Sequence, residues 1–203
     1  LRHPSTLWTA AILQEKTGLS RAALSYVLSA LVREELVVEE RAGPDGKPGP
    51  RTKHYAMPDP AAAFRAWTHA YRWTRNPSLT VAMPAADPRR ALKRLKAALE
   101  PLRWALTMHA AVAQRGAHAV TDRIHCYVDL RGSRQLPELA LAMGWEPAQA
   151  GQLTLLVPYY RHTLWRDIEE VGGLPVVDPL QLALDLWHYP LRGREAARVV
   201  ARR

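Results

Sequence analysis

The apolar residues within positions 17–37 recur at the spacing of a helix. One side of this helix is expected to face a core, and its residues are Leu24, Val27, Leu28 and Leu31. The other side has small, hydroxyl-bearing or basic residues where a solvated helix would have Lys and Glu. These residues are Ala22, Ser25, Tyr26, Ser29 and Arg33. A face that is small and able to form hydrogen bonds favours a helix that enters a narrow groove.

A shorter helix is predicted just before this one, over residues 7–16. Gly18 is expected to end it, and Ser20 is the expected N-cap of the helix that follows. The residues of the shorter helix that are expected to face inward are Trp8, Ala11, Ile12 and Leu13. Two helices joined by a tight turn containing glycine are typical of a helix-turn-helix.

Two β-like segments follow the second helix, over residues 36–41 and 52–57. They flank the sequence AGPDGKPGP, whose Gly and Pro residues predict the turn of a hairpin. Helix, turn, helix and hairpin in this order predict a winged helix-turn-helix domain over residues 1–60.

The rest of the chain predicts a basic helical connector over residues 61–85 and an α/β domain over residues 86–203. In the latter, Asp87 and Asp178 each precede a proline at the first position of a predicted helix and are the expected N-caps. Residues 123–130 alternate in polarity, which predicts a strand. The expected fold class is therefore mixed α/β (α+β), with an N-terminal winged helix-turn-helix followed by a mixed α/β C-terminal domain.

The charge of the chain indicates what kind of partner it binds. The net charge is +9 and the pI is about 10.1. Residues 1–60 and 107–203 each have a net charge of +1, and residues 61–106 have +7. Such an excess of basic over acidic residues favours a polyanionic partner, usually nucleic acid. The alternative is a basic protein from a GC-rich genome, in which Arg is common through codon bias.

Other features limit the chemistry that the chain can perform. The single cysteine, Cys126, rules out an internal disulfide framework and favours a cytoplasmic protein. No apolar run approaches the roughly 20 residues of a membrane helix. No phosphate-binding loop, hydrolase motif or metal-site spacing of Cys and His is present, so we expect no metal, no cofactor and no enzymatic activity. Asp129 and the other scattered acids leave a nuclease-like site as a weaker alternative.

The predicted second helix and hairpin supply the candidate DNA contacts. A recognition helix touches base edges in the major groove, and small side chains let its backbone approach. On the helix these residues are Ser20, Arg21, Ala22, Ser25, Tyr26 and Ser29. On the hairpin, or wing, they are Arg41, Lys47, Arg51 and Lys53. The alternative is a winged helix used for protein contacts, which the nearly neutral charge of residues 1–60 favours.

Basic residues of the connector and of the helix after it could extend this surface. They are Arg65, Arg72, Arg75, Arg89, Arg90, Lys93 and Lys96. The same residues could contact RNA or an acidic protein, or form an ordinary solvated face. The sequence leaves these alternatives open.

The C-terminal sequence GLPVVDPLQLALDLWHYPLRGREAARVV resembles the closing segment of AbiEi-type antitoxins of type IV (abortive infection) toxin–antitoxin systems. The similar positions are Val176, Val177, Asp178, Pro179, Gln181, Asp185, Leu186, Arg192, Gly193, Arg194, Glu195 and Ala196. The segments RWALTMHAAVAQRG and RIHCYVDL are similar to the helix-then-strand core of that family. The resemblance implies a winged helix that represses its own operon at promoter repeats in double-stranded DNA, and a C-terminal domain that helps to neutralise a nucleotidyltransferase toxin.

Three functional hypotheses remain at this point. The first is a sequence-specific repressor that autoregulates a toxin–antitoxin operon and acts as its antitoxin, binding as a homodimer or cooperatively on DNA. The second is a plasmid replication initiator or architectural DNA-binding protein whose basic connector also grips DNA. The third is an enzyme with a nuclease-like second domain.

Overall fold

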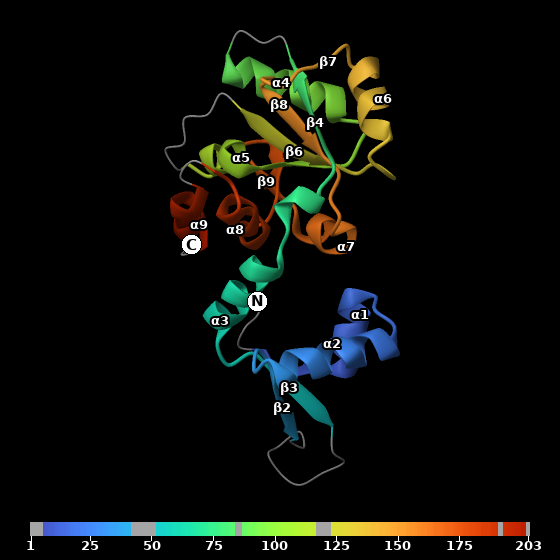
Figure 1. Cartoon of the computed structure of the whole chain (residues 1–203), viewed down its shortest axis with the longest axis vertical. Helices are drawn as coiled ribbons and strands as arrows, with labels where there is room; N and C mark the ends of the chain where they lie inside the picture. The colour runs from blue at the N-terminus through green and yellow to red at the C-terminus, as the bar shows by residue number, and fades with distance from the viewer. Residues whose placement is uncertain (1–5, 42–51, 84–86, 117–122, 191–192, 202–203) are drawn as a thin grey trace. The chain divides into compact units, whose positions relative to one another are not determined.

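A computed structural model describes residues 6–41, 52–83, 87–116, 123–190 and 193–201 of the chain (Figure 1). The chain divides into two compact units, Leu1–Tyr71 and Arg72–Arg203. Helices and strands occur in both units, so the expectation of a mixed α/β protein is confirmed. Within the described residues, no helix is long and apolar enough to span a membrane.

The first unit combines helices with a small antiparallel sheet. Its elements are β1 (Trp8–Thr9), α1 (Ala10–Thr17), α2 (Arg21–Arg33), β2 (Val38–Arg41), β3 (Lys53–Ala56) and α3 (Pro60–Ala70). The strands form a sheet in the order β1-β3-β2. The core of this unit consists of Leu24, Leu28, Val37 and Tyr55, with Leu13, Leu31 and Val32 packed against it. Because α2 contributes Leu24 and Leu28, this core fixes which face of α2 points outward.

Two predictions for this unit were wrong in detail. The first helix begins at Ala10 rather than at residue 7, because Trp8 and Thr9 pair with β3 as a strand. Ile12 and Val27 were expected to face inward, yet each is 40% exposed, and Ala11 is exposed as well. The small core reaches only the centre of each apolar stripe, so residues at its edge stay in contact with solvent.

The second unit is built around a mixed seven-stranded sheet. Its strands are β4 (Ser78–Ala82), β5 (Trp104–Thr107), β6 (Ile124–Val128), β7 (Glu146–Pro147), β8 (Leu153–Leu156), β9 (Glu169–Val171) and β10 (Leu174–Val176). They lie in the order β7-β4-β8-β6-β5-β10-β9, with β8–β6 and β5–β10 parallel and the other pairs antiparallel. Every residue of β6 is buried, so both faces of this predicted strand are covered.

Helices and 3₁₀ turns of the second unit surround this sheet. They are η1 (Trp73–Arg75), α4 (Pro88–Leu99), α5 (Met108–Gln114), α6 (Gln135–Ala142), α7 (Arg161–Leu164), η2 (Trp165–Asp167), α8 (Pro179–Trp187) and α9 (Gly193–Ala201). Both predicted caps are confirmed: Asp87 accepts a hydrogen bond from Arg90 N at 2.9 Å, and Asp178 from Leu180 N at 3.0 Å. Helices α5, α8 and α9 pack together, and α5 also packs on β5 and β6 (Figure 1).

The segment predicted as a connector contributes to both units. Helix α3 falls in the first unit, and strand β4 belongs to the sheet of the second. Cys126 is fully buried on β6. Burial raises the pKa of its thiol, so the thiol stays protonated and unreactive.

Candidate nucleic-acid interface

Helix α2 presents a small polar face to solvent. Its start is fixed by Ser20, whose Oγ accepts a hydrogen bond from Ala23 N at 3.2 Å. Tyr26 is the most prominent side chain on this face, with 79% of its surface exposed. All of the predicted helix contacts are exposed: Ser20, Arg21, Ala22, Ser25, Tyr26 and Ser29. The burial of Leu24 and Leu28 on the opposite side is what turns these residues outward.

The charge along α2 is uneven. The helix contains Arg21 at its start, Arg33 at its end and no acidic residue. Arg33 Nε lies 3.6 Å from Glu34 Oε1, so the last turn is close to an acid. Arg21 instead adds its charge to the positive end of the helix dipole. The N-terminal half of α2 is therefore the part that best suits an anionic groove.

The base of the hairpin has two of the four predicted wing residues. Arg41 and Lys53 face each other across the β2–β3 pair. Both contact Glu39 Oε1, with Lys53 Nζ at 3.0 Å and Arg41 Nε at 3.4 Å. The hydrogen bond from Lys53, helped by Arg41, lowers the pKa of the Glu39 carboxyl. Lys47 and Arg51, together with the predicted turn, lie outside the described residues.

The predicted accessory basic residues are all exposed; they are Arg65, Arg72, Arg75, Arg89, Arg90, Lys93 and Lys96. Four of them lie on α4, whose inward positions Ala91, Leu95 and Leu99 are buried. Lys96 Nζ donates a hydrogen bond to the carbonyl oxygen of Gly173 at 2.9 Å, next to β10. Helix α4 thus presents a basic strip on the outside of the second unit.

The C-terminal motif points inward instead. Asp178, Gln181 and Asp185 are 3%, 4% and 0% exposed. The Asp185 carboxylate accepts hydrogen bonds from Thr107 Oγ1 at 2.5 Å, Gln181 Nε2 at 2.8 Å and Tyr127 OH at 3.0 Å. These bonds join α8 to β5 and β6. At the far end of the motif Glu195 is exposed, and the guanidinium of Arg194 lies 5.9 Å from the centre of the Trp187 ring.

The second unit also contains the acid considered for a nuclease-like site. Asp129 follows β6, and its Oδ1 accepts a hydrogen bond from Arg161 Nη2 at 2.6 Å. Within the described ranges, no group of three or more His, Cys, Asp and Glu side chains is placed to hold a metal ion. The residues that surround Asp129 could not be predicted from the sequence, because Arg103, Arg161 and Trp165 come from distant segments.

The exposed, acid-free helix α2 lies in the first unit, and the buried polar motif lies in the second. A family model described as "Transcriptional regulator, AbiEi antitoxin, Type IV TA system" matches residues 57–203. The chain belongs to this family, which confirms the resemblance seen in its C-terminal sequence. The match covers the second unit and α3, and residues before 57 lie outside it. Comparisons with curated proteins and with solved structures found no match.

Proposed function

We propose that this chain is a sequence-specific DNA-binding repressor of its own toxin–antitoxin operon and also the antitoxin of that system. The observation that carries the DNA-binding part is the exposed face of α2, which has small and hydroxyl-bearing residues, an arginine near its start and no acid. Membership of the AbiEi family supports the regulatory and antitoxin parts.

In this proposal residues 1–60 are a winged helix-turn-helix domain with α2 as the recognition helix. The major groove is about 12 Å wide and admits a helix whose N-terminal residues reach base edges. Arg21 would bind a guanine edge, and Ser25 and Ser29 would bind bases or phosphates. The wing residues Arg41, Lys47, Arg51 and Lys53 would contact the DNA backbone. Glu39 reduces the charge at the wing base, where it pairs with two of them.

Residues 86–203 form the antitoxin domain in this proposal, and residues 61–85 connect it to the first. The family match covers this domain, and the family description names an antitoxin. We assign to this domain the neutralisation of a cognate nucleotidyltransferase toxin. The repressor binds promoter repeats, as a homodimer or cooperatively.

The proposal is tested by binding of the purified chain to its own upstream DNA and to scrambled DNA across a salt series. We expect tighter binding to the upstream DNA, with an affinity that falls steeply as salt rises. Arg21→Ala should reduce the preference for upstream DNA by roughly 10-fold or more, since a bidentate contact to a base contributes about 1–3 kcal/mol of discrimination. Arg33→Ala is the matched control, because it removes the same charge from the other end of α2.

Two results would contradict this proposal. Equal binding to both DNAs would show that the chain does not read sequence, and an unchanged preference in Arg21→Ala would show that α2 is not the reading helix. Equal and salt-sensitive binding would favour the second candidate, an architectural protein or replication initiator. The exposed basic strip of α4 supports that candidate.

A further inference from the structure

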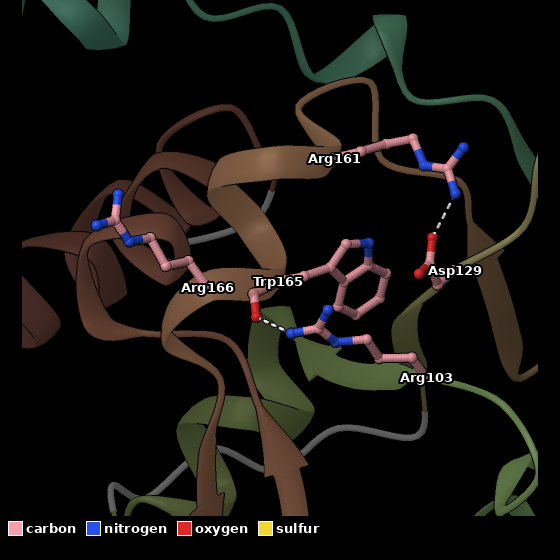
Figure 2. A pocket seen from close by; sticks show the side chains of 5 residues that line it. All are labelled: Arg103, Asp129, Arg161, Trp165 and Arg166. Carbon is pink, nitrogen blue, oxygen red and sulfur yellow. Dashed lines mark hydrogen bonds and ion pairs between the residues drawn. The ribbon is translucent and has the colours of Figure 1, made fainter. Parts of the chain in front are cut away.

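A pocket of about 450 Å³ opens on the second unit beside Asp129. It is lined by Arg103, Asp129, Arg161, Trp165 and Arg166 (Figure 2). Arg103 precedes β5 and Asp129 follows β6, and Asp129 N donates a hydrogen bond to Arg103 O at 2.8 Å. Arg161 and Trp165 are one helical turn apart, at the start of α7 and at its end. Three segments therefore meet at one end of the β5–β6 pair.

Neighbouring groups hold two arginines of this pocket in place. The guanidinium of Arg103 lies 5.4 Å from the centre of the Trp165 ring and donates a hydrogen bond to the Trp165 carbonyl oxygen. Arg161 is held by its ion pair with Asp129. Figure 2 shows the Arg103 guanidinium beside the indole and the Arg161 guanidinium beside Asp129, whereas the Arg166 side chain points away from the indole. Each guanidinium has five N–H groups, so these contacts leave donors for a ligand.

The indole of Trp165 supplies a third donor. Trp165 is only 5% exposed, and its Nε1 is buried without a hydrogen-bond partner among the described residues. In Figure 2 this nitrogen is on the edge of the ring nearest to Arg161 and Asp129. Buried N–H groups nearly always have a partner, so an unpartnered one beside a pocket indicates a missing acceptor.

We propose that this pocket binds a small phosphate monoester that also has hydroxyl groups, the chemistry shared by nucleotides and sugar phosphates. Arg103 and Arg161 would bind the phosphate oxygens, because a guanidinium donates two parallel hydrogen bonds to such a group. The Trp165 indole N–H would donate to a further oxygen. Asp129 is the one acceptor side chain among the described lining residues and would accept a hydrogen bond from a ligand hydroxyl. The volume exceeds that of phosphate alone and lies within the usual range of small-molecule sites.

The test titrates the full chain with adenosine 5′-monophosphate, ribose 5-phosphate, adenosine and inorganic phosphate. Calorimetry measures affinity, and the amide and indole N–H resonances in a ¹⁵N-labelled sample report the site. We expect saturable binding of at least one phosphate monoester, weaker binding of inorganic phosphate and none of adenosine. The indole resonance that is absent in Trp165→Phe should shift on binding. A preference for adenosine 5′-monophosphate over ribose 5-phosphate would identify a nucleotide, and the reverse a sugar phosphate.

Variants test whether the ligand binds in this pocket or at another basic surface. Arg103→Ala and Arg161→Ala should each weaken binding about 10-fold or more, and Trp165→Phe by about 3- to 10-fold. Arg131→Ala is the matched control, since Arg131 is an exposed arginine of the same unit outside the pocket lining, and it should change nothing. The preference for upstream DNA should also stay unchanged in all four variants, which keeps this test independent of the proposed repressor function.

Three outcomes would overturn the inference. One is the absence of saturable binding up to about 10 mM ligand. A dissociation constant above that concentration would be far weaker than ordinary small-molecule affinities. Another is binding that leaves the Trp165 indole resonance in place. The third is a loss of affinity in Arg131→Ala as large as in Arg103→Ala, because binding would then follow net charge rather than the pocket.

Discussion

At the scale of single residues, buried polar side chains determine how the second unit holds together. Asp178 acts as a cap, which its residue type alone predicts. Asp185 joins α8 to the sheet, because its fully buried carboxylate accepts hydrogen bonds from Thr107 and Tyr127 as well as from Gln181. A buried carboxylate without such donors would strongly destabilise the fold. The family-like acid at this position is therefore explained by its place between α8 and the sheet.

Another buried polar side chain, His125, is expected to make stability depend on pH. Burial lowers the pKa of His125 from the ordinary 6.5 to about 4, with smaller contributions from His109 and Arg123. The unfolded chain thus binds a proton near pH 6.5 that the folded chain does not bind until about pH 4. The contribution of neutral His125 to the free energy of unfolding is full above pH 6.5 and is lost as the pH falls from 6.5 to about 4. Between pH 7 and pH 5 we expect the free energy of unfolding to fall by about 2 kcal/mol from this group.

Urea unfolding of the wild type and of His125→Phe at several pH values between 7 and 5 measures this effect. Phenylalanine retains a ring that can pack edge-to-face against Tyr189, as His125 does, but it cannot titrate. The difference in unfolding free energy between the two proteins should change with pH in that window. Parallel curves would mean that His125 titrates alike in the folded and unfolded chains. Because His109 retains its own burial-lowered pKa in both proteins, its effect largely cancels in the difference.

At the scale of elements, the contact between α8 and α9 depends on a glycine. A Cβ added to Gly193, the first residue of α9, would lie 2.2 Å from the carbonyl oxygen of Leu186 on α8. No side chain fits at that distance from a backbone atom, so the two helices can approach this closely only with glycine there. The glycine of the family-like motif thus has a packing explanation.

The corresponding prediction is that Gly193→Ala destabilises the chain by about 1–3 kcal/mol, because the backbone must shift to admit the methyl group. Gly132→Ala is a matched control in the same unit, since a Cβ there would meet nothing within 4 Å. Thermal and urea unfolding of the two variants should separate them clearly. Equal stability of both variants would show that α9 moves away from α8 at little cost.

At the scale of the whole molecule, the basic charge is concentrated outside the predicted recognition helix. Residues 61–106 have a net charge of +7, and residues 1–60 have +1. Arg89 and Lys93 are exposed on α4 of the second unit. Charge of this kind strengthens binding to any DNA through phosphate contacts and adds no sequence preference. We therefore expect α2 to decide which DNA is bound and α4 to set how tightly any DNA is bound.

Removal of two charges from α4 tests this division. The double variant Arg89→Ala, Lys93→Ala should weaken binding to upstream and scrambled DNA alike and reduce the slope of log affinity against log salt by about 2, since each lost phosphate contact removes about 0.9. The double variant Arg131→Ala, Arg134→Ala removes the same charge from exposed positions elsewhere in the second unit. Equal losses in the two double variants would mean that net charge alone matters and that α4 makes no direct contact.

Much of the local structure could be predicted because its causes are local. Ser20, Asp87 and Asp178 each bond to a backbone N–H two or three residues ahead, so their capping role can be seen in a short window of sequence. The strand around Cys126 was likewise predicted from alternation. This approach fails at the edges of apolar stripes, where Val27 and Ile12 have the right spacing for burial but are each 40% exposed.

The sequence by itself determined the elements, the family and the polar character of α2, since periodicity, caps and a continuous C-terminal motif depend on neighbouring residues. Only the tertiary structure decided that Asp185 is enclosed by β5 and β6. Its partners there, Thr107 and Tyr127, are 78 and 58 positions away in the sequence. The tertiary structure also brought Arg103, Asp129 and Trp165 to one pocket. Contacts of this range depend on strand order, because β5 and β6 become neighbours through hydrogen bonds that no local pattern specifies.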